Sequence, residues 1–175
     1  KSAARVVRLF GFDPKVAFLS HSTFGEPATD RTKRLSDAVA LLKKSDVDFI
    51  EVGLPYSDPL ADGPTIQDSS QKALANGINL DIVFDQLMSI KDSNKTPLVL
   101  MGYLNQMLKY GEDKFCQKVI DCGINTVILP DLPMVEYENH YKDLFDKYGI
   151  TNVFLITPHT SEERIYKIDN YTNSF

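Results

Sequence analysis

The chain has 175 residues, of which 43% are hydrophobic and 25% are charged, and its formal net charge is −5. This length and hydrophobic content are enough to bury one sizeable core, so we expect a single domain. The negative charge argues against nucleic acid or an anionic membrane surface as a partner. No apolar run approaches the roughly 20 residues of a transmembrane helix and no signal-peptide pattern opens the chain, which favours a cytoplasmic protein.

Apolar strands and amphipathic helices alternate along the chain. We expect strands at residues 16–20, 48–52, 97–103, 125–129 and 152–156. Helical periodicity follows them at residues 35–42, 65–75, 80–89, 115–120 and 137–148, with a last helix after residue 160. Asn79 is the predicted N-cap of the helix at 80–89, and Thr160 with Glu163 is a predicted capping box.

Strands that are apolar throughout and are each followed by a helix indicate a parallel sheet covered by helices, an α/β fold. Two architectures compete, an open doubly wound sheet and a (β/α)₈ barrel. No G-x-G-x-x-G follows the first strand, which weakens the dinucleotide-binding version of the doubly wound sheet. About five βα units are present, whereas a full barrel usually takes about 250 residues. The sheet is therefore either open or part of an incomplete barrel.

The cysteine and histidine residues give no sign of a metal or cofactor site. Cys116 and Cys122 lie six positions apart in a helical pattern and read as reduced, half-buried packing residues of a cytosolic protein. His21, His140 and His159 have no spacing typical of metal ligands. We therefore expect no metal and no cofactor.

Residues 50–64, IEVGLPYSDPLADGP, place an acid inside an apolar strand and follow it with a stiff, proline-rich loop. An ionised Glu51 in a buried parallel strand is costly unless it is paired or used. At a barrel mouth its pKa would be raised into a useful acid–base range, and the loop could return Asp62 to the same cavity. The alternative is that Glu51 is salt-bridged and Asp62 caps the helix that begins near Pro64.

This segment resembles a known signature. Residues 50–67, IEVGLPYSDPLADGPTIQ, are similar to the tryptophan synthase alpha chain family, and the resemblance continues through LMGYLNQMLKYG, DCGINTVILPDLPMVE and FLITPHTSEERI. It covers about residues 46–175. It implies a TIM barrel that cleaves indole-3-glycerol phosphate, its small-molecule substrate, to indole and glyceraldehyde 3-phosphate. It also implies a heterotetramer with a pyridoxal-phosphate beta chain that receives the indole.

The resemblance also implies residue roles. Glu51 matches the acid–base residue, and Asp62 matches the residue that binds the indole N–H and stabilises the positive charge. Tyr103 matches a pocket aromatic, with plain core packing as the alternative. Residues that match loops facing the beta chain are Pro55, Tyr56, Ser57, Asp58, Asp131 and Pro133.

Two departures qualify the resemblance. The family's glycine-rich phosphate loops, its lid and a tyrosine that hydrogen-bonds the catalytic Asp are expected beyond Phe175. We therefore expect the 175-residue chain to cleave its substrate poorly or not at all.

The second departure is at the other end. Residues 1–44, which include LSHSTFG, resemble a phosphate acetyltransferase domain, with a join near residues 45–46. The chain would then be a chimera. Residues 1–44 would take the place of the first βα unit of the alpha-chain fold, and residues 1–175 would form one domain. The alternative is a natural alpha chain with a diverged N-terminal segment. Besides a lyase, the sequence leaves open a non-catalytic fragment and, ranked last, an acyltransferase.

Overall fold

The computed structural model describes residues 48–60, 62–92 and 94–171. The predicted strand at 16–20, the helix at 35–42 and His21 lie outside these residues. The described elements are β1 (Ile50–Gly53), α3 (Pro64–Ala75), α4 (Leu80–Ile90), β2 (Leu98–Met101), α5 (Leu104–Tyr110), α6 (Glu112–Asp121), β3 (Thr126–Ile128), α7 (Met134–Glu136), the π-helix η1 (Tyr137–Tyr141), α8 (Lys142–Tyr148), β4 (Thr151–Val153) and α9 (Glu162–Asp169).

The sheet has four described strands in the order β1-β2-β3-β4, and every neighbouring pair is parallel. Each of these four strands overlaps a strand predicted from the sequence. A doubly wound sheet reverses its strand order at a switch point. Here the sheet order follows the chain order throughout the described strands, as it does in the wall of a barrel, so the fold is a partial TIM barrel.

The two faces of the sheet carry different residues because side chains alternate along each strand. Val99, Ile128 and Val153 form a small apolar cluster on one face, the face that becomes the interior of a barrel. Glu51 is the register partner of Val99 and shares this inner face. The acid of the predicted site therefore lies on the face opposite the helices.

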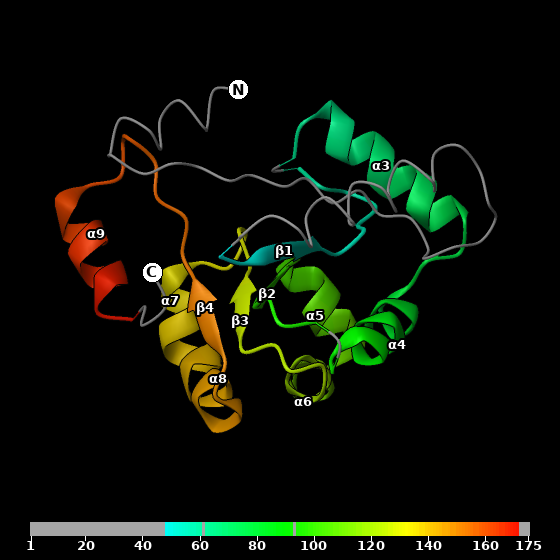
Figure 1. Cartoon of the computed structure of the whole chain (residues 1–175). Coiled ribbons are helices and arrows are strands. Elements are labelled where there is room, and N and C mark those ends of the chain that lie inside the picture. Colours follow the sequence, from blue (N-terminus) through cyan, green and yellow to red (C-terminus); the bar gives the residue numbers. More distant parts are fainter. Residues whose placement is uncertain (1–47, 61, 93, 172–175) are drawn as a thin grey trace.

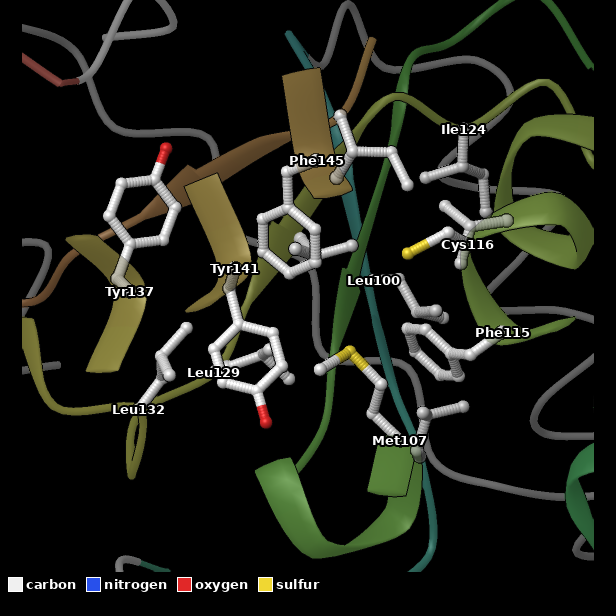
Figure 2. Close-up of a cluster of buried hydrophobic side chains, with 14 of the residues drawn as sticks. Leu100, Met107, Phe115, Cys116, Ile124, Leu129, Leu132, Tyr137, Tyr141 and Phe145 are labelled. Atoms are coloured by element: carbon white, nitrogen blue, oxygen red, sulfur yellow. The ribbon is translucent and has the colours of Figure 1, made fainter. Parts of the chain in front are cut away.

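The helices cover the outer face, where α4, α5, α6 and α8 pack together (Figure 1). Leu100 and Val127 point into this layer and are 1% exposed. Figure 2 shows the cluster beneath the helices, in which Phe115, Tyr141 and Phe145 meet residues of β2 and of the loops after the strands. This is the main core.

Three local predictions need comparison with the structure. Asn79 is the N-cap of α4, where its Oδ1 accepts a hydrogen bond from the Ile82 N–H over 3.0 Å, as predicted. The capping box at Thr160 is wrong by one residue. Ser161 is the N-cap of α9 and accepts from the Arg164 N–H, whereas the Thr160 hydroxyl accepts from the Thr157 N–H within the preceding turn.

The predicted helix at 137–148 is divided by the π-helix η1. Tyr137 and Tyr141 are both buried, and both rings lie near Phe145. Among the described residues, no helix is both long and apolar enough to cross a bilayer.

The cysteines are more deeply buried than predicted. Cys116 is 0% exposed and Cys122 is 2% exposed, and both are free thiols. Burial raises the pKa of the Cys116 thiol to about 12, so it stays protonated. Both cysteines are packing residues.

Candidate active site

The loop after β1 carries the predicted catalytic pair. Leu54 continues the ladder, with its N–H donating to the Met101 carbonyl over 2.7 Å. Two short turns then fold the loop back: the Leu60 N–H donates to the Asp58 carbonyl, and the Asp62 N–H donates to the Pro59 carbonyl. The loop thus reverses direction and returns Asp62 toward the carboxyl end of β1.

Glu51 and Asp62 lie close enough to interact electrostatically. Partial desolvation by the surrounding protein raises the pKa of Glu51 above its usual value, and the negative charge of Asp62 raises this pKa further. Glu51 nevertheless remains open to solvent. A carboxyl group with a raised pKa that is still accessible fits a general acid.

The competing structural roles for the two acids are not seen. No ion pair joins Glu51 to any other residue in the described part of the chain. The N-cap of α3 is Gly63, which has no side-chain cap, so Asp62 is not the helix cap. The backbone carbonyl of Asp62 instead accepts from Gln67 Nε2 over 2.9 Å, which anchors the end of the loop to α3.

Tyr103 lies in the core and also contacts the candidate site. It is 7% exposed and so belongs to the core, yet its hydroxyl donates a hydrogen bond to Oδ2 of Asp62 over 3.0 Å. The resemblance placed the tyrosine that binds the catalytic Asp beyond Phe175, whereas in this structure Tyr103 makes such a bond. The family resemblance implied a pocket aromatic at this position, but no sequence pattern indicated the partner of its hydroxyl.

The residues matched to the beta-chain interface divide into exposed and buried ones. Ser57 and Asp58 are exposed, and the Ser57 hydroxyl donates to Asp58 Oδ2 over 2.6 Å. Tyr56 is partly buried. Pro55 is buried, and its carbonyl accepts from Gln106 Nε2 over 2.9 Å, so it supports the loop from beneath.

Asp131 and Pro133 follow β3 and are both exposed. Asp131 Oδ1 accepts from the Leu104 N–H over 2.8 Å and so caps the first turn of α5. The loops after β1 and β3 therefore both attach to the start of α5, at the carboxyl edge of the sheet.

Possible metal ligands are scattered. The described residues contain no group of three or more His, Cys, Asp or Glu side chains that could hold a metal ion. His140 lies 3.6 Å from Glu136 on an exposed helix surface. The backbone N–H of His159 donates to the Thr157 hydroxyl in the turn before α9.

Together, the site offers an accessible acid with a raised pKa and a second carboxylate held by a phenol. Two carboxyl groups in different environments can divide the work of proton transfer and charge stabilisation. The acid stands on a strand and the second carboxylate on a loop anchored to two helices, α3 and α5.

The sequence model of the tryptophan synthase alpha chain family matches residues 12–175. The chain belongs to this family. A tryptophan synthase alpha chain of Flavobacterium johnsoniae is 56% identical over 144 residues, covering 81% of this chain and 57% of the relative. The Bacteroides thetaiotaomicron relative is 43% identical over 171 residues, covering 98% of this chain and 66% of the relative.

Solved alpha chains have the same fold. The tryptophan synthase subunit alpha of Legionella pneumophila superposes with a TM-score of 0.74 at 32% identity, over 98% of this chain and 63% of that chain. A tryptophan synthase complex of Pyrococcus furiosus superposes with a TM-score of 0.72 at 34% identity, over 82% of this chain and 59% of that chain. The chain thus spans about three fifths of the length of these alpha chains.

The alpha-chain match also crosses the join expected near residues 45–46. It begins at residue 12, and relatives align over 98% of the chain. These relatives give no support for a phosphate acetyltransferase segment.

Proposed function

We propose that this chain serves the retro-aldol cleavage of indole-3-glycerol phosphate to indole and glyceraldehyde 3-phosphate, as a cytoplasmic lyase. Glu51 protonates the indole ring carbon and takes up the proton of the glycerol hydroxyl. Asp62 accepts a hydrogen bond from the indole N–H and stabilises the positive charge that develops on the ring. The carbon–carbon bond then breaks, with the indole ring as leaving group.

The observation that carries this proposal is the pairing of Glu51 with Asp62. Protonation of the ring carbon needs a proton donor, and the raised pKa of Glu51 favours its protonated form. The cation that follows needs a nearby anion, and Asp62 is held by the Tyr103 hydroxyl for that purpose. Membership of the alpha-chain family supports the same chemistry.

Because the 175-residue chain is expected to cleave poorly, the test uses an extended chain, lengthened at its C-terminus to the full length of its alpha-chain relatives, and measures indole release from indole-3-glycerol phosphate by the extended chain and by its Glu51→Gln variant. The extended chain should release indole faster than the 175-residue chain does. Glu51→Gln keeps the side-chain shape but removes the proton donor, so it should abolish release. Glu163→Gln, on the exposed face of α9, is the matched control and should leave release unchanged. A Glu51→Gln variant that keeps the full rate would refute the acid–base assignment.

We further propose a tryptophan synthase beta chain as the partner, bound at the carboxyl edge of the sheet. The exposed side chains of Ser57, Asp58, Asp131 and Pro133 support this surface, as does the solved tryptophan synthase complex of Pyrococcus furiosus. Asp58→Ala combined with Pro133→Ala should weaken beta-chain binding in a pull-down or by calorimetry. Asp68→Ala, on an exposed part of α3, is the control. Equal binding by all variants would refute the proposal that this surface binds the beta chain.

We infer, finally, that residues 1–175 form one βα-repeat domain. The family match from residue 12 supports an alpha-chain origin for the N-terminal segment. The resemblance of residues 1–44, which include LSHSTFG, to a phosphate acetyltransferase domain is the competing proposal for this segment. Exchange of residues 1–44 for the aligned Bacteroides thetaiotaomicron segment tests it: unfolding cooperativity should be preserved if both are alpha-chain segments.

A further inference from the structure

The first turn of α5 is tied to the loop after β1 by one buried side chain. Gln106 is 8% exposed, and its Oε1 accepts from the Tyr103 N–H over 3.0 Å. Its Nε2 donates to the Pro55 carbonyl over 2.9 Å. One amide group therefore fixes the backbone of Tyr103 relative to the residue before Tyr56.

Tyr56 then fixes the orientation of the Tyr103 ring. The two rings are stacked, with centroids 4.8 Å apart and planes 27° from parallel. The Tyr56 hydroxyl accepts a hydrogen bond from Asn105 Nδ2 over 3.0 Å. The Tyr56 ring is thus held by α5 at both ends, through Pro55 and through its own hydroxyl, and lies against one face of Tyr103.

The orientation of Tyr103 matters because its hydroxyl binds Asp62. A phenol oxygen lies at the far end of a rigid ring, so a small tilt of the ring moves the oxygen by a large part of a hydrogen-bond length. Neither Tyr56 nor Asn105 forms a described hydrogen bond with Glu51 or Asp62, so their influence would pass through Tyr103.

We propose that Tyr56 and Asn105 are positioning residues for Asp62, which act through the stacked ring of Tyr103. This inference rests on the proposed function for its kinetic consequence, but the positioning itself does not depend on turnover. Tyr56 adjoins the exposed Ser57 and Asp58, so the same contacts connect the proposed partner surface to the carboxylate.

The positioning is tested without substrate by nuclear magnetic resonance titration of the Glu51 carboxyl carbon. Asp62→Asn should lower the pKa of Glu51, because it removes a neighbouring negative charge. In a Tyr56→Leu background, where Asp62 is released, the same substitution should have no more than about half that effect. An equal effect in both backgrounds would overturn the proposal.

Turnover provides a second measurement. In the extended chain, Tyr56→Leu should lower kcat by about 10-fold with little change in KM, since misplacement of a catalytic group mainly affects the transition state. Tyr56→Phe and Asn105→Ala remove the same hydrogen bond, so their smaller effects should be equal and should not add in the double variant. Tyr166→Leu, at a tyrosine that is 68% exposed on α9, is the matched control.

The outcomes are separable. If the extended chain releases no indole, the proposed function is refuted, while the titration still decides the positioning. If Tyr56→Leu fails to fold, as judged by near-ultraviolet circular dichroism, Asn105→Ala takes its place in the titration. Additive effects of Tyr56→Phe and Asn105→Ala would show that the two side chains do not act together.

Discussion

The Tyr103 hydroxyl donates to Asp62 over 3.0 Å although the two residues are 41 positions apart in the chain. The contact exists because β1 and β2 are parallel neighbours, so that the loops after both strands emerge at the same edge of the sheet. It joins a residue of the buried core to a carboxylate that is partly exposed. The position of Asp62 therefore depends on the packing of the core as well as on its own loop.

Tyr103→Phe isolates this hydrogen bond, because it keeps the ring and its stacking on Tyr56. A hydrogen bond to a charged group contributes about 1.5–3 kcal/mol, so under the proposed function indole release by the extended chain should fall by about 10-fold or more. Tyr148→Phe removes a comparable phenol–carboxylate bond, to Asp113 on an exposed surface, and should leave the rate unchanged. Steady-state kinetics of both variants check the prediction, and an equal loss in both would contradict it.

Glu51→Gln should also change stability, in a direction set by the raised pKa. The folded state binds the Glu51 proton more tightly than the unfolded state, so Glu51 stabilises the fold at low pH and this contribution is lost as the pH rises through the folded pKa. At pH 7 the Gln variant should therefore be the more stable one, by less than about 1 kcal/mol because Glu51 is exposed. Urea unfolding measures this difference in the free energy of unfolding between the Gln variant and the wild type, and the difference should vanish near pH 4.

Asp81 provides a contrast of opposite sign. Its hydrogen bond from Tyr110 lowers the pKa of Asp81, so its contribution to stability is present at neutral pH and is lost as the pH falls through the folded pKa. Asp81→Asn should destabilise the protein at pH 7. If both substitutions shifted stability in the same direction at pH 7, one of the two pKa assignments would be wrong.

Asn152 offers a gain in stability. It is 0% exposed on β4, and neither polar atom of its side chain has a hydrogen-bond partner in the described part of the chain. A buried polar group without a partner costs about 1–3 kcal/mol, so Asn152→Leu, which is similar in shape, should raise the free energy of unfolding by about 1 kcal/mol or more. Chemical denaturation measures it, with exposed Asn125→Leu as the control. A loss of stability at position 152 would show that the amide has a partner.

Gly102 should tolerate no side chain. A Cβ added there would lie 2.8 Å from Leu54 Cδ1 and 3.1 Å from Gln106 Oε1, whereas one added at Gly63 would meet nothing within 4 Å. Overpacking of this kind costs about 1–3 kcal/mol, so Gly102→Ala should lower the melting temperature clearly more than Gly63→Ala does. Equal melting temperatures would mean that Leu54 and Gln106 move aside at no cost.

The sequence predicted the four described strands, and it singled out one acid as a candidate site residue. Continuous apolar runs ending in polar loops predicted β1 to β4, because strands buried on both faces leave that pattern. Glu51 stood out because an acid is rare in such a run. Direct inspection of the residues left the roles of Glu51 and Asp62 open, and the geometry of the loop after β1 now favours a shared site.

What the sequence could not reveal depends on tertiary contacts. The helical periodicity at residues 137–148 predicted one continuous helix and gave no sign of the π-helix at Tyr137–Tyr141. The cap at Ser161 rather than Thr160 reflects the turn in which the Thr160 hydroxyl is already used. The bonds of Gln106 to Pro55 and of Asn105 to Tyr56 join residues about 50 positions apart, beyond the reach of local patterns.

The close approach at Gly102 has a consequence for how this protein tolerates change. The residue has no functional group and touches neither carboxylate, yet it lets Leu54 and Gln106 come together beneath the loop that carries Asp62. Random mutagenesis selected for activity should therefore find this position as intolerant as a catalytic one. Redesign of the specificity of the site should therefore keep Gly102 unchanged and vary the exposed end of the loop instead.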